Sequence, residues 1–283
     1  MTTAYDPAAK FEIKVWDVEF RRTPTRTLMA RIYQPQGAQT FPALLDLHGG
    51  GWNEKNRFAN EPMDRAVAAS GMLVVAIDMT LAAEAPYPAA VQDANYGMRW
   101  LKSKAAEWNG SAVNLGVLGS SSGGHIAELL GMRTRDPRYN AHPLPGRADI
   151  DASVAYIAAR SPISDPFARY QQAERIAHPK LPLMTRNFFK PWDSIFEANP
   201  QHILDREEKV TLPPLLIMQG ELDATVTRPM QEKFTASYCA AGGECQFEFF
   251  EGCEHEWVAT PGPQTDRAHE MLKSFIARQL RNL

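Results

Sequence analysis

Residues 113–132 read VNLGVLGSSSGGHIAELLGM, and this stretch decides the fold. The apolar run before Gly119 is typical of a buried strand, and the pattern from residue 124 onward predicts a helix. The sequence GSSSG at 119–123 joins them in a turn so sharp that its middle residue is strained, and the glycines let neighbouring backbone approach. Only Ser121 has glycine two residues away on both sides. We therefore predict that Ser121 is a nucleophile presented above a sheet, beside a helix N-terminus that favours developing negative charge.

Short apolar runs alternate with longer helical patterns on both sides of this stretch. Such alternation predicts an α/β fold with a mostly parallel sheet flanked by helices, and the first two runs look like an antiparallel pair. The expected strands are 12–20, 28–33, 42–48, 72–78, 113–119, 153–158, 215–219 and 246–250. The expected helices are 91–104, 124–132, 229–240 and 265–280.

Residues 160–212 interrupt the alternation with many prolines, aromatic residues and charges. A plain connection between a strand and a helix needs only a few residues, so this segment is several times too long. We expect a core of residues 1–159 and 213–283, with a largely helical cap at 160–212 over the carboxyl ends of the strands. A decorated surface loop without a role at the site is the alternative.

The second motif is HGGGW at 48–52, which follows an apolar strand upstream of the serine. Acyl transfer builds an oxyanion that needs backbone N–H donors, and glycines allow the chain to turn its amides toward a substrate. We assign the oxyanion hole to Gly50, Gly51 and the N–H of Ser122. His48 precedes the serine, so we expect it to order this loop by hydrogen bonding and not to act as the base.

Asp46 interrupts the apolar strand just before HGGGW. A buried carboxylate needs a partner, and strand periodicity points Asp46 to the same side as His48. We expect an Asp46–His48 contact that stiffens the loop, with an exposed strand end as the alternative.

The catalytic acid and base are expected after the serine, in that order. Asp223 follows the apolar strand at 215–219, where a carboxylate can hold an imidazole in the right tautomer, and Glu221 is the near competitor. His255 follows the strand at 246–250, where it can exchange a proton with Ser121. The remaining histidines precede the acid or lie within an expected helix.

The composition restricts the partners. The net charge is -3 and no run of lysine and arginine stands out, so neither nucleic acid nor an anionic membrane is expected. The N-terminus lacks a signal-peptide pattern, and no apolar stretch approaches the roughly 20 residues of a membrane span. Three cysteines without zinc or redox spacing are expected to be free thiols. We expect a cytoplasmic protein with a small-molecule substrate and no metal or cofactor, and a homodimer is left open.

Four motifs together resemble a known group. HGGGW at 48–52, GSSSGG at 119–124, D-x-x-V at 223–226 and H-x-W at 255–257 are similar to the α/β-hydrolase esterases related to hormone-sensitive lipase. The Trp after the glycines and the Gly-Gly-His after the serine look closer to the branch of kynurenine formamidase and BD-FAE-type esterases. Relatives often carry Tyr-Arg-Leu-Ala-Pro-Glu where this chain has DMTLAAE at 78–84, and the missing arginine weakens membership of the hormone-sensitive lipase group proper.

The resemblance implies a serine hydrolase with a Ser121–His255–Asp223 triad that cleaves a small carboxylic ester. Amide or formamide hydrolysis of the arylformamidase type uses the same groups and is the alternative. A non-catalytic ligand receptor, like the plant gibberellin receptors that lack a complete triad, is a remote third. Aromatic residues are expected to line an apolar pocket, although packing within the cap explains them equally well. The residues expected to bind substrate are Trp52, Phe188, Phe189, Trp192 and Trp257.

Overall fold

An eight-stranded sheet runs through the protein in a computed structural model that describes residues 5–281. The predicted lack of a signal-peptide pattern concerns the N-terminus, and residues 1–4 of it lie outside the described residues. The strand order is β1-β2-β4-β3-β5-β6-β7-β8. β1 and β2 pair antiparallel to each other, β2 pairs antiparallel to β4, and the remaining neighbours are parallel. The predicted α/β-hydrolase architecture is thus confirmed at the level of the sheet.

The elements follow the expected alternation. The strands are β1 (Ile13–Arg22), β2 (Thr27–Pro35), β3 (Ala43–Leu47), β4 (Leu73–Ile77), β5 (Gly116–Ser120), β6 (Tyr156–Arg160), β7 (Leu215–Gly220) and β8 (Cys245–Phe250). The α-helices are α1 (Glu61–Ala69), α2 (Ala89–Lys104), α3 (Ser122–Met132), α4 (Pro166–Arg175), α5 (Leu181–Phe188), α6 (Ser194–Glu197), α7 (Pro200–Asp205), α8 (Arg228–Ala240) and α9 (Pro263–Arg281). Within residues 5–281, no helix combines the length and apolarity needed to cross a lipid bilayer.

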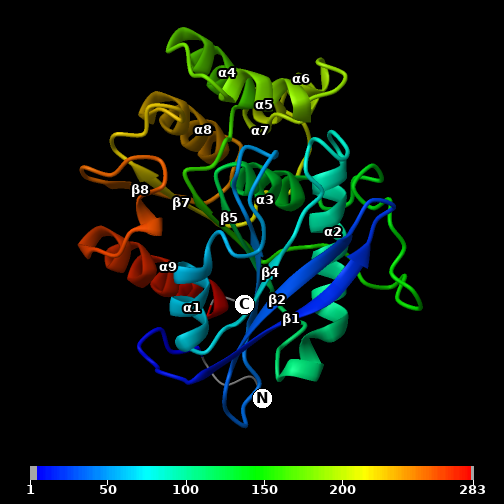
Figure 1. The fold of residues 1–283 in the computed structure, drawn as a ribbon. Coiled ribbons are helices and arrows are strands. Elements are labelled where there is room, and N and C mark those ends of the chain that lie inside the picture. Colours follow the sequence, from blue (N-terminus) through cyan, green and yellow to red (C-terminus); the bar gives the residue numbers. More distant parts are fainter. Residues whose placement is uncertain (1–4, 282–283) are drawn as a thin grey trace.

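Helices cover both faces of the sheet. α1 and α9 pack together on one face, and α2, α3 and α8 contribute buried side chains to the other (Figure 1). Strands β3 to β7 are buried along their whole length, as the continuous apolar runs predicted. The two covered faces explain why these strands do not alternate between apolar and polar residues.

The structure differs locally from the expectation at two strand starts and one helix. β5 begins at Gly116 and not at Val113, which lies in a bend and leaves 65% of its surface exposed, and β6 begins at Tyr156 and not at Ser153. Helix α1 was not expected, because nine residues with a narrow buried stripe at Met63, Val67 and Ala68 give little periodic signal.

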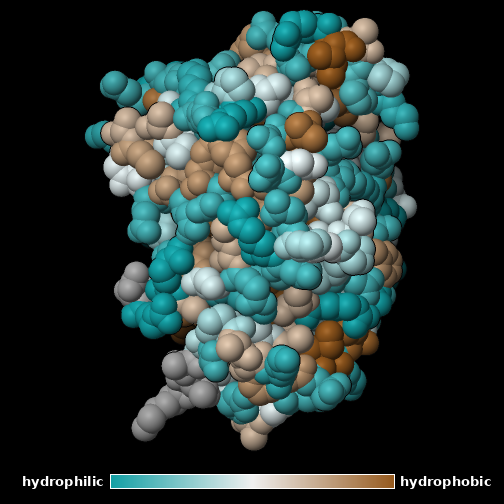
Figure 2. All heavy atoms as spheres, turned by 90° about the vertical axis from the view of Figure 1, so that its left-hand side faces the viewer, coloured by the Kyte–Doolittle hydropathy of each residue, from teal (hydrophilic) through white to brown (hydrophobic). Residues whose placement is uncertain are grey.

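The edge strand β8 is covered by arginine side chains. The guanidinium of Arg228 lies 4.2 Å from the ring centre of Phe249, and that of Arg267 lies 4.5 Å from the ring centre of Phe250. The side of the molecule that carries β8, α8 and α9 presents mostly hydrophilic residues, with apolar ones between them (Figure 2). Charged side chains of this kind discourage the edge of a sheet from pairing with another chain.

The segment between β6 and β7 is helical, and its helices lie together at the top of Figure 1. Each of two helices begins with a capping side chain followed by proline. The carboxylate of Asp165 accepts from the N–H of Ala168, and the amide oxygen of Asn199 accepts from the N–H of His202. Helical structure was expected here, whereas the division of the chain into core and cap remains a prediction.

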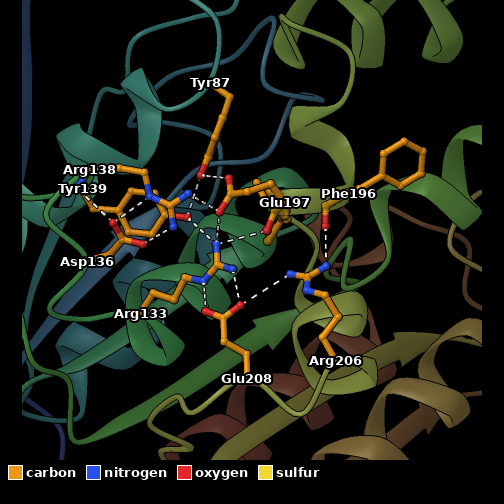
Figure 3. A network of polar contacts seen from close by, with 11 residues as sticks. Tyr87, Arg133, Asp136, Arg138, Tyr139, Phe196, Glu197, Arg206 and Glu208 are labelled. Carbon is orange, nitrogen blue, oxygen red and sulfur yellow. Dashed lines mark hydrogen bonds and ion pairs between the residues drawn. The ribbon is translucent and has the colours of Figure 1, made fainter.

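A network of polar side chains attaches this segment to the core (Figure 3). Arg133, at the end of α3, donates through Nε and Nη2 to both carboxylate oxygens of Glu208, at 2.8 and 2.6 Å. Arg133 also pairs with Glu197, which accepts from the hydroxyl of Tyr87 at 2.6 Å. Arg133 is buried, and a two-pronged arginine–carboxylate contact is among the stronger ion pairs in proteins. The helices above the sheet are therefore held in one position relative to α3.

Candidate active site

Ser121 lies in a strained turn between β5 and α3. Its φ is 52° and its ψ is -115°, a conformation that residues other than glycine rarely adopt. Its N–H donates to the carbonyl of Arg160 at 2.8 Å, and its own carbonyl accepts from the N–H of Ile163 at 3.2 Å. These backbone hydrogen bonds with Arg160 and Ile163 therefore stabilise the strained conformation of Ser121.

The two glycines of the turn are required by close backbone contacts. A Cβ at Gly119 would lie 2.4 Å from the carbonyl oxygen of Gly123, and a Cβ at Gly123 would lie 2.1 Å from the carbonyl oxygen of Leu47. Both distances are shorter than non-bonded contacts of a real Cβ. Both neighbouring atoms belong to the backbone, which cannot move away as a flexible side chain could. This is the physical reason for the G-x-S-x-G spacing in this chain.

Three side chains that are distant in the sequence form a hydrogen-bonded chain at this turn. Nε2 of His255 lies 2.8 Å from Oγ of Ser121, and Nδ1 of His255 lies 2.5 Å from Oδ2 of Asp223. Ser121 and Asp223 are buried, whereas the His255 side chain leaves 21% of its surface exposed. A hydroxyl, an imidazole and a carboxylate in this order can form an activated nucleophile.

The carboxylate of Asp223 has several donors besides the imidazole. Oδ1 accepts from the N–H groups of Thr225 and Val226, and Oδ2 accepts from Nε2 of Gln219 at 2.9 Å. Burial alone raises the pKa of Asp223, but the hydrogen bond and charge of His255 and the two backbone donors outweigh it and lower the pKa below its ordinary value. The acid therefore stays ionised and can orient the imidazole. Glu221, the competing candidate, is exposed and instead accepts from the N–H of Gly252.

The loop that carries His255 is held by Arg160, a residue that no motif in the sequence pointed to. Nη1 of Arg160 donates to the carbonyl of His255 at 2.7 Å, and its guanidinium lies 5.8 Å from the ring centre of Trp257. Arg160 pairs with Ser120 in the register of β5 and β6, so it lies beside Ser121. A polar residue at the carboxyl end of an apolar strand was the available signal, and Gln219 near the end of β7 shows the same pattern.

The glycine loop lies against the nucleophile. A Cβ at Gly49 would lie 3.3 Å from the Cβ of Ser121, and Gly50 and Gly51 have φ values of 103° and 57°, where glycine is favoured. Among the hydrogen bonds between residues 5–281, the N–H groups of Gly50 and Gly51 have no backbone acceptor. Ser122 begins α3, and the first N–H groups of a helix lack helical partners. The structure thus leaves these N–H groups without a backbone partner among the described residues, and their role as an oxyanion hole remains a prediction.

His48 orders the glycine loop, but the expected Asp46–His48 contact is wrong. Nδ1 of His48 donates to the carbonyl of Gly49 at 2.8 Å, and Nε2 accepts from the N–H of Met79 at 3.3 Å. Asp46 instead accepts from Nδ2 of Asn60 at 2.8 Å. Burial raises the pKa of Asp46. The side chain faces α1, because Asn60 immediately precedes that helix and brings an amide donor within reach.

Trp52 joins the glycine loop to the helices above it. Its indole N–H donates to Nδ1 of His125 at 3.2 Å, and its ring stacks on Phe188 of α5 at a centroid distance of 4.8 Å. Nε2 of His125 donates in turn to the carbonyl of Ala198 at 2.7 Å. The loop, α3 and the segment above the sheet are therefore locked together around one histidine.

The five residues expected to bind substrate lie in two kinds of surroundings. Trp52, Phe188 and Phe189 leave 3%, 0% and 1% of their surface exposed and pack against one another. Trp192 packs on Tyr170, and Trp257 packs on Phe250, and both indoles remain partly exposed. The first three thus build the contact between loop and helices in this conformation, and substrate contact by any of the five remains a prediction.

Glu128, two turns after Ser121 on α3, is a fully buried carboxyl group. Burial raises its pKa to about 8. Oγ of Ser164 lies 2.7 Å from Oε1 of Glu128 and 3.1 Å from Oε1 of Gln231, and one hydroxyl hydrogen serves only one of them. A protonated Glu128 completes the chain, because it donates to Ser164 while Ser164 donates to Gln231.

We expect the protein to lose stability as the pH rises through this range. A carboxyl group with a raised pKa in the folded state contributes its full stabilisation below its ordinary value of 4.5, and the stabilisation is lost by about pH 8. The neutral variant Glu128→Gln keeps a donor to Ser164, so its melting temperature should fall by about 3 °C less than that of the wild type between pH 6 and 8.5. Circular dichroism melts measure both curves. Glu232→Gln, an exposed site, serves as control, and parallel curves for wild type and Glu128→Gln would contradict the argument.

The sequence of this chain is similar to a known family and to curated esterases. The BD-FAE family matches residues 31–237. Carboxylesterase NlhH of Mycobacterium tuberculosis (strain CDC 1551 / Oshkosh) is 35% identical over 108 residues, which are 38% of this chain and 34% of that protein. The match thus spans about a third of the length of this curated relative.

Solved structures agree on the fold. A Pyrobaculum calidifontis esterase superimposes with a TM-score of 0.77 and 21% identity, covering 96% of this chain and 87% of that chain. Thermogutta terrifontis esterase 2, in a form phosphonylated by sarin, gives a TM-score of 0.76 and 21% identity, covering 95% and 94%. At this identity the likeness concerns the fold, and it confirms the α/β-hydrolase fold expected from the sequence.

Proposed function

Because the chain belongs to the BD-FAE family, we propose that it is a serine hydrolase that cleaves small carboxylic esters through an acyl-enzyme. The observation that carries the proposal is the continuous hydrogen-bonded chain from Ser121 through His255 to Asp223. The carboxylesterase and esterase names of the similar proteins support the same class of reaction.

The first step is attack by Ser121 on the ester carbonyl. His255 accepts the hydroxyl proton at Nε2, because Nδ1 is occupied by its bond to Asp223. The carbonyl oxygen becomes an oxyanion, which the N–H groups of Gly50, Gly51 and Ser122 stabilise. Donors held in place before the reaction stabilise the transition state without a cost of reorganisation.

The second half of the reaction returns the proton. His255 donates it to the leaving alcohol, and the acyl group remains on Ser121. A water molecule then gives a proton to Nε2 of His255 and attacks the acyl-enzyme. His255 returns that proton to Oγ of Ser121 as the bond between Oγ and the acyl carbon breaks, and the carboxylic acid product leaves. The ionised Asp223 stabilises the imidazolium that forms in each half, because its pKa is held below the ordinary value.

The proposal is tested by a panel of substrates and a covalent probe. We expect a fluorophosphonate to label Ser121 and p-nitrophenyl acetate or butyrate to be hydrolysed with saturation kinetics. N-formylkynurenine, assayed in parallel, separates ester from formamide hydrolysis, since an amine is the poorer leaving group. Turnover of the formamide at a higher kcat/KM than every ester would replace the ester assignment with the alternative from the sequence. Failure to label Ser121 would favour a ligand receptor.

A further inference from the structure

Arg169 is a buried cation without an anionic partner. It lies on α4, above the sheet, and leaves 3% of its surface exposed. Within the described residues 5–281, its hydrogen-bonded side chain is Thr185 of α5, whose Oγ1 accepts from Nη1 at 3.2 Å, and its buried Nε has no partner. Among the ion pairs between residues 5–281, none includes this side chain.

The other buried arginines of this protein have a carboxylate or a backbone carbonyl as acceptor. Arg133 pairs with Glu197 and Glu208, Arg99 donates to the carbonyl of His142, and Arg160 donates to the carbonyl of His255. A guanidinium removed from water without an anion costs free energy, since the lost hydration is not replaced. Burial lowers the pKa of Arg169 to about 10, opposed by the charge of Asp223, so the group is still a cation at neutral pH. Among residues 5–281, Arg169 has neither a carboxylate nor a carbonyl acceptor, so its guanidinium retains N–H groups for an anion that arrives from outside.

The position of Arg169 relates it to the reacting groups. Its guanidinium carbon lies 5.8 Å from the ring centre of Trp52, which directly follows the glycines of the oxyanion loop. One turn further along α4, Nε2 of Gln172 donates to the carbonyl of Ala224 at 3.0 Å, beside the catalytic acid. Arg169 therefore stands between the oxyanion loop and the acid turn, on the side of α4 that faces the site.

We propose that Arg169 binds a carboxylate of the substrate, so that the natural substrate is an ester whose acid or alcohol portion carries a second, free carboxylate. This assignment rests on the proposed function and names its substrate class. The planar guanidinium presents parallel N–H groups that match a carboxylate, and its unpartnered Nε–H is available for that contact. One positive charge balances a monoanion, whereas a phosphate dianion would need a second cation beside Arg169.

The test compares charged and neutral esters of equal size. Mono-p-nitrophenyl glutarate against p-nitrophenyl pentanoate places the carboxylate on the acid side, and 4-acetoxybenzoate against methyl 4-acetoxybenzoate places it on the alcohol side. We expect the wild type to prefer the charged member of one pair by at least fivefold in kcat/KM, mainly through KM. A ratio below fivefold in both pairs overturns the assignment.

Variants of Arg169 test whether the preference for the charged ester depends on this side chain. Arg169→Gln should bring the preferred ratio down to about 1, and Arg169→Lys should retain part of it. The matched control is Arg186→Gln on the neighbouring helix, whose side chain is 54% exposed and pairs with Glu174. The control should keep the wild-type ratio. A ratio that survives Arg169→Gln, or that falls equally in the control, overturns the assignment even where the wild type shows a preference.

A binding measurement separates this inference from the proposed function. Glutarate has no ester bond, and calorimetry should detect its binding to the wild type and to Arg186→Gln but not to Arg169→Gln. If Ser121 is not labelled and no ester is cleaved, the proposed function fails, and glutarate binding still decides the role of Arg169. If esters are cleaved and glutarate does not bind the wild type, the inference fails and the proposed function stands.

Discussion

Replacement of Ser121 by alanine is expected to lower kcat for ester hydrolysis by at least about 10⁴-fold, to the level left by the oxyanion donors alone. The change removes one oxygen atom, and with it the group that forms the acyl-enzyme. The partners that hold the turn are backbone N–H and carbonyl groups, which alanine retains. The circular dichroism spectrum and the melting temperature should therefore remain close to those of the wild type.

The measurement is steady-state hydrolysis of p-nitrophenyl acetate together with fluorophosphonate labelling. Ser153→Ala is the matched control, because Ser153 is exposed. It precedes the amino end of β6, whereas Ser121 follows the carboxyl end of β5. The control should keep full activity and full labelling. Activity of Ser121→Ala within tenfold of the wild type would show that another residue is the nucleophile.

The second large effect is expected for Asp223→Asn, which should lower kcat by about 10³- to 10⁴-fold. The oxygen of an asparagine can keep the bonds from the N–H groups of Thr225 and Val226, and its amide then turns toward His255. An amide N–H can only donate to Nδ1, and this forces the imidazole to carry its proton on Nε2. In that tautomer His255 cannot accept the proton of Ser121. The amide nitrogen also replaces Oδ2, so the bond from Nε2 of Gln219 is lost while the bonds from Thr225 and Val226 remain.

Glu221→Gln is the control for this variant. Glu221 lies on the same turn, was the competing acid in the sequence, and is exposed. We expect its kcat to remain within about twofold of the wild type, since it only accepts from the N–H of Gly252 outside the hydrogen-bonded chain. A large loss in Glu221→Gln with little change in Asp223→Asn would exchange the roles of the two carboxylates.

Glycine positions limit how much this site can be altered. The contacts of Gly119 and Gly123 involve backbone of β3 and α3, so a larger residue at either position displaces the nucleophile itself. Gly51 differs, because a Cβ there would meet the flexible end of Met184, at 2.8 Å from its Cε. Met184 therefore lies over the oxyanion loop.

The local pattern of the chain was sufficient to predict the strained turn at Ser121, whose role as nucleophile remains a proposal. A strand, a tight turn and a helix are specified by neighbouring residues, and the need for Gly119 and Gly123 arises from a few backbone atoms. The order of motifs along the chain was sufficient to name Asp223 and His255 as partners. Parallel strands end at the same edge of a sheet, so residues that follow them converge.

Other parts of the site depend on packing between distant segments. The bond from Arg160 to the His255 loop requires β5, β6, β7 and β8 to lie side by side, and no local pattern specifies that order. The partner of Asp46 is Asn60, because α1 packs where the sequence showed no clear helix. Nothing in the sequence distinguishes Arg169 from an ordinary helix residue. Its burial without an anion follows from the position of α4 over the sheet, because desolvation depends on everything that surrounds a group and not on its neighbours along the chain.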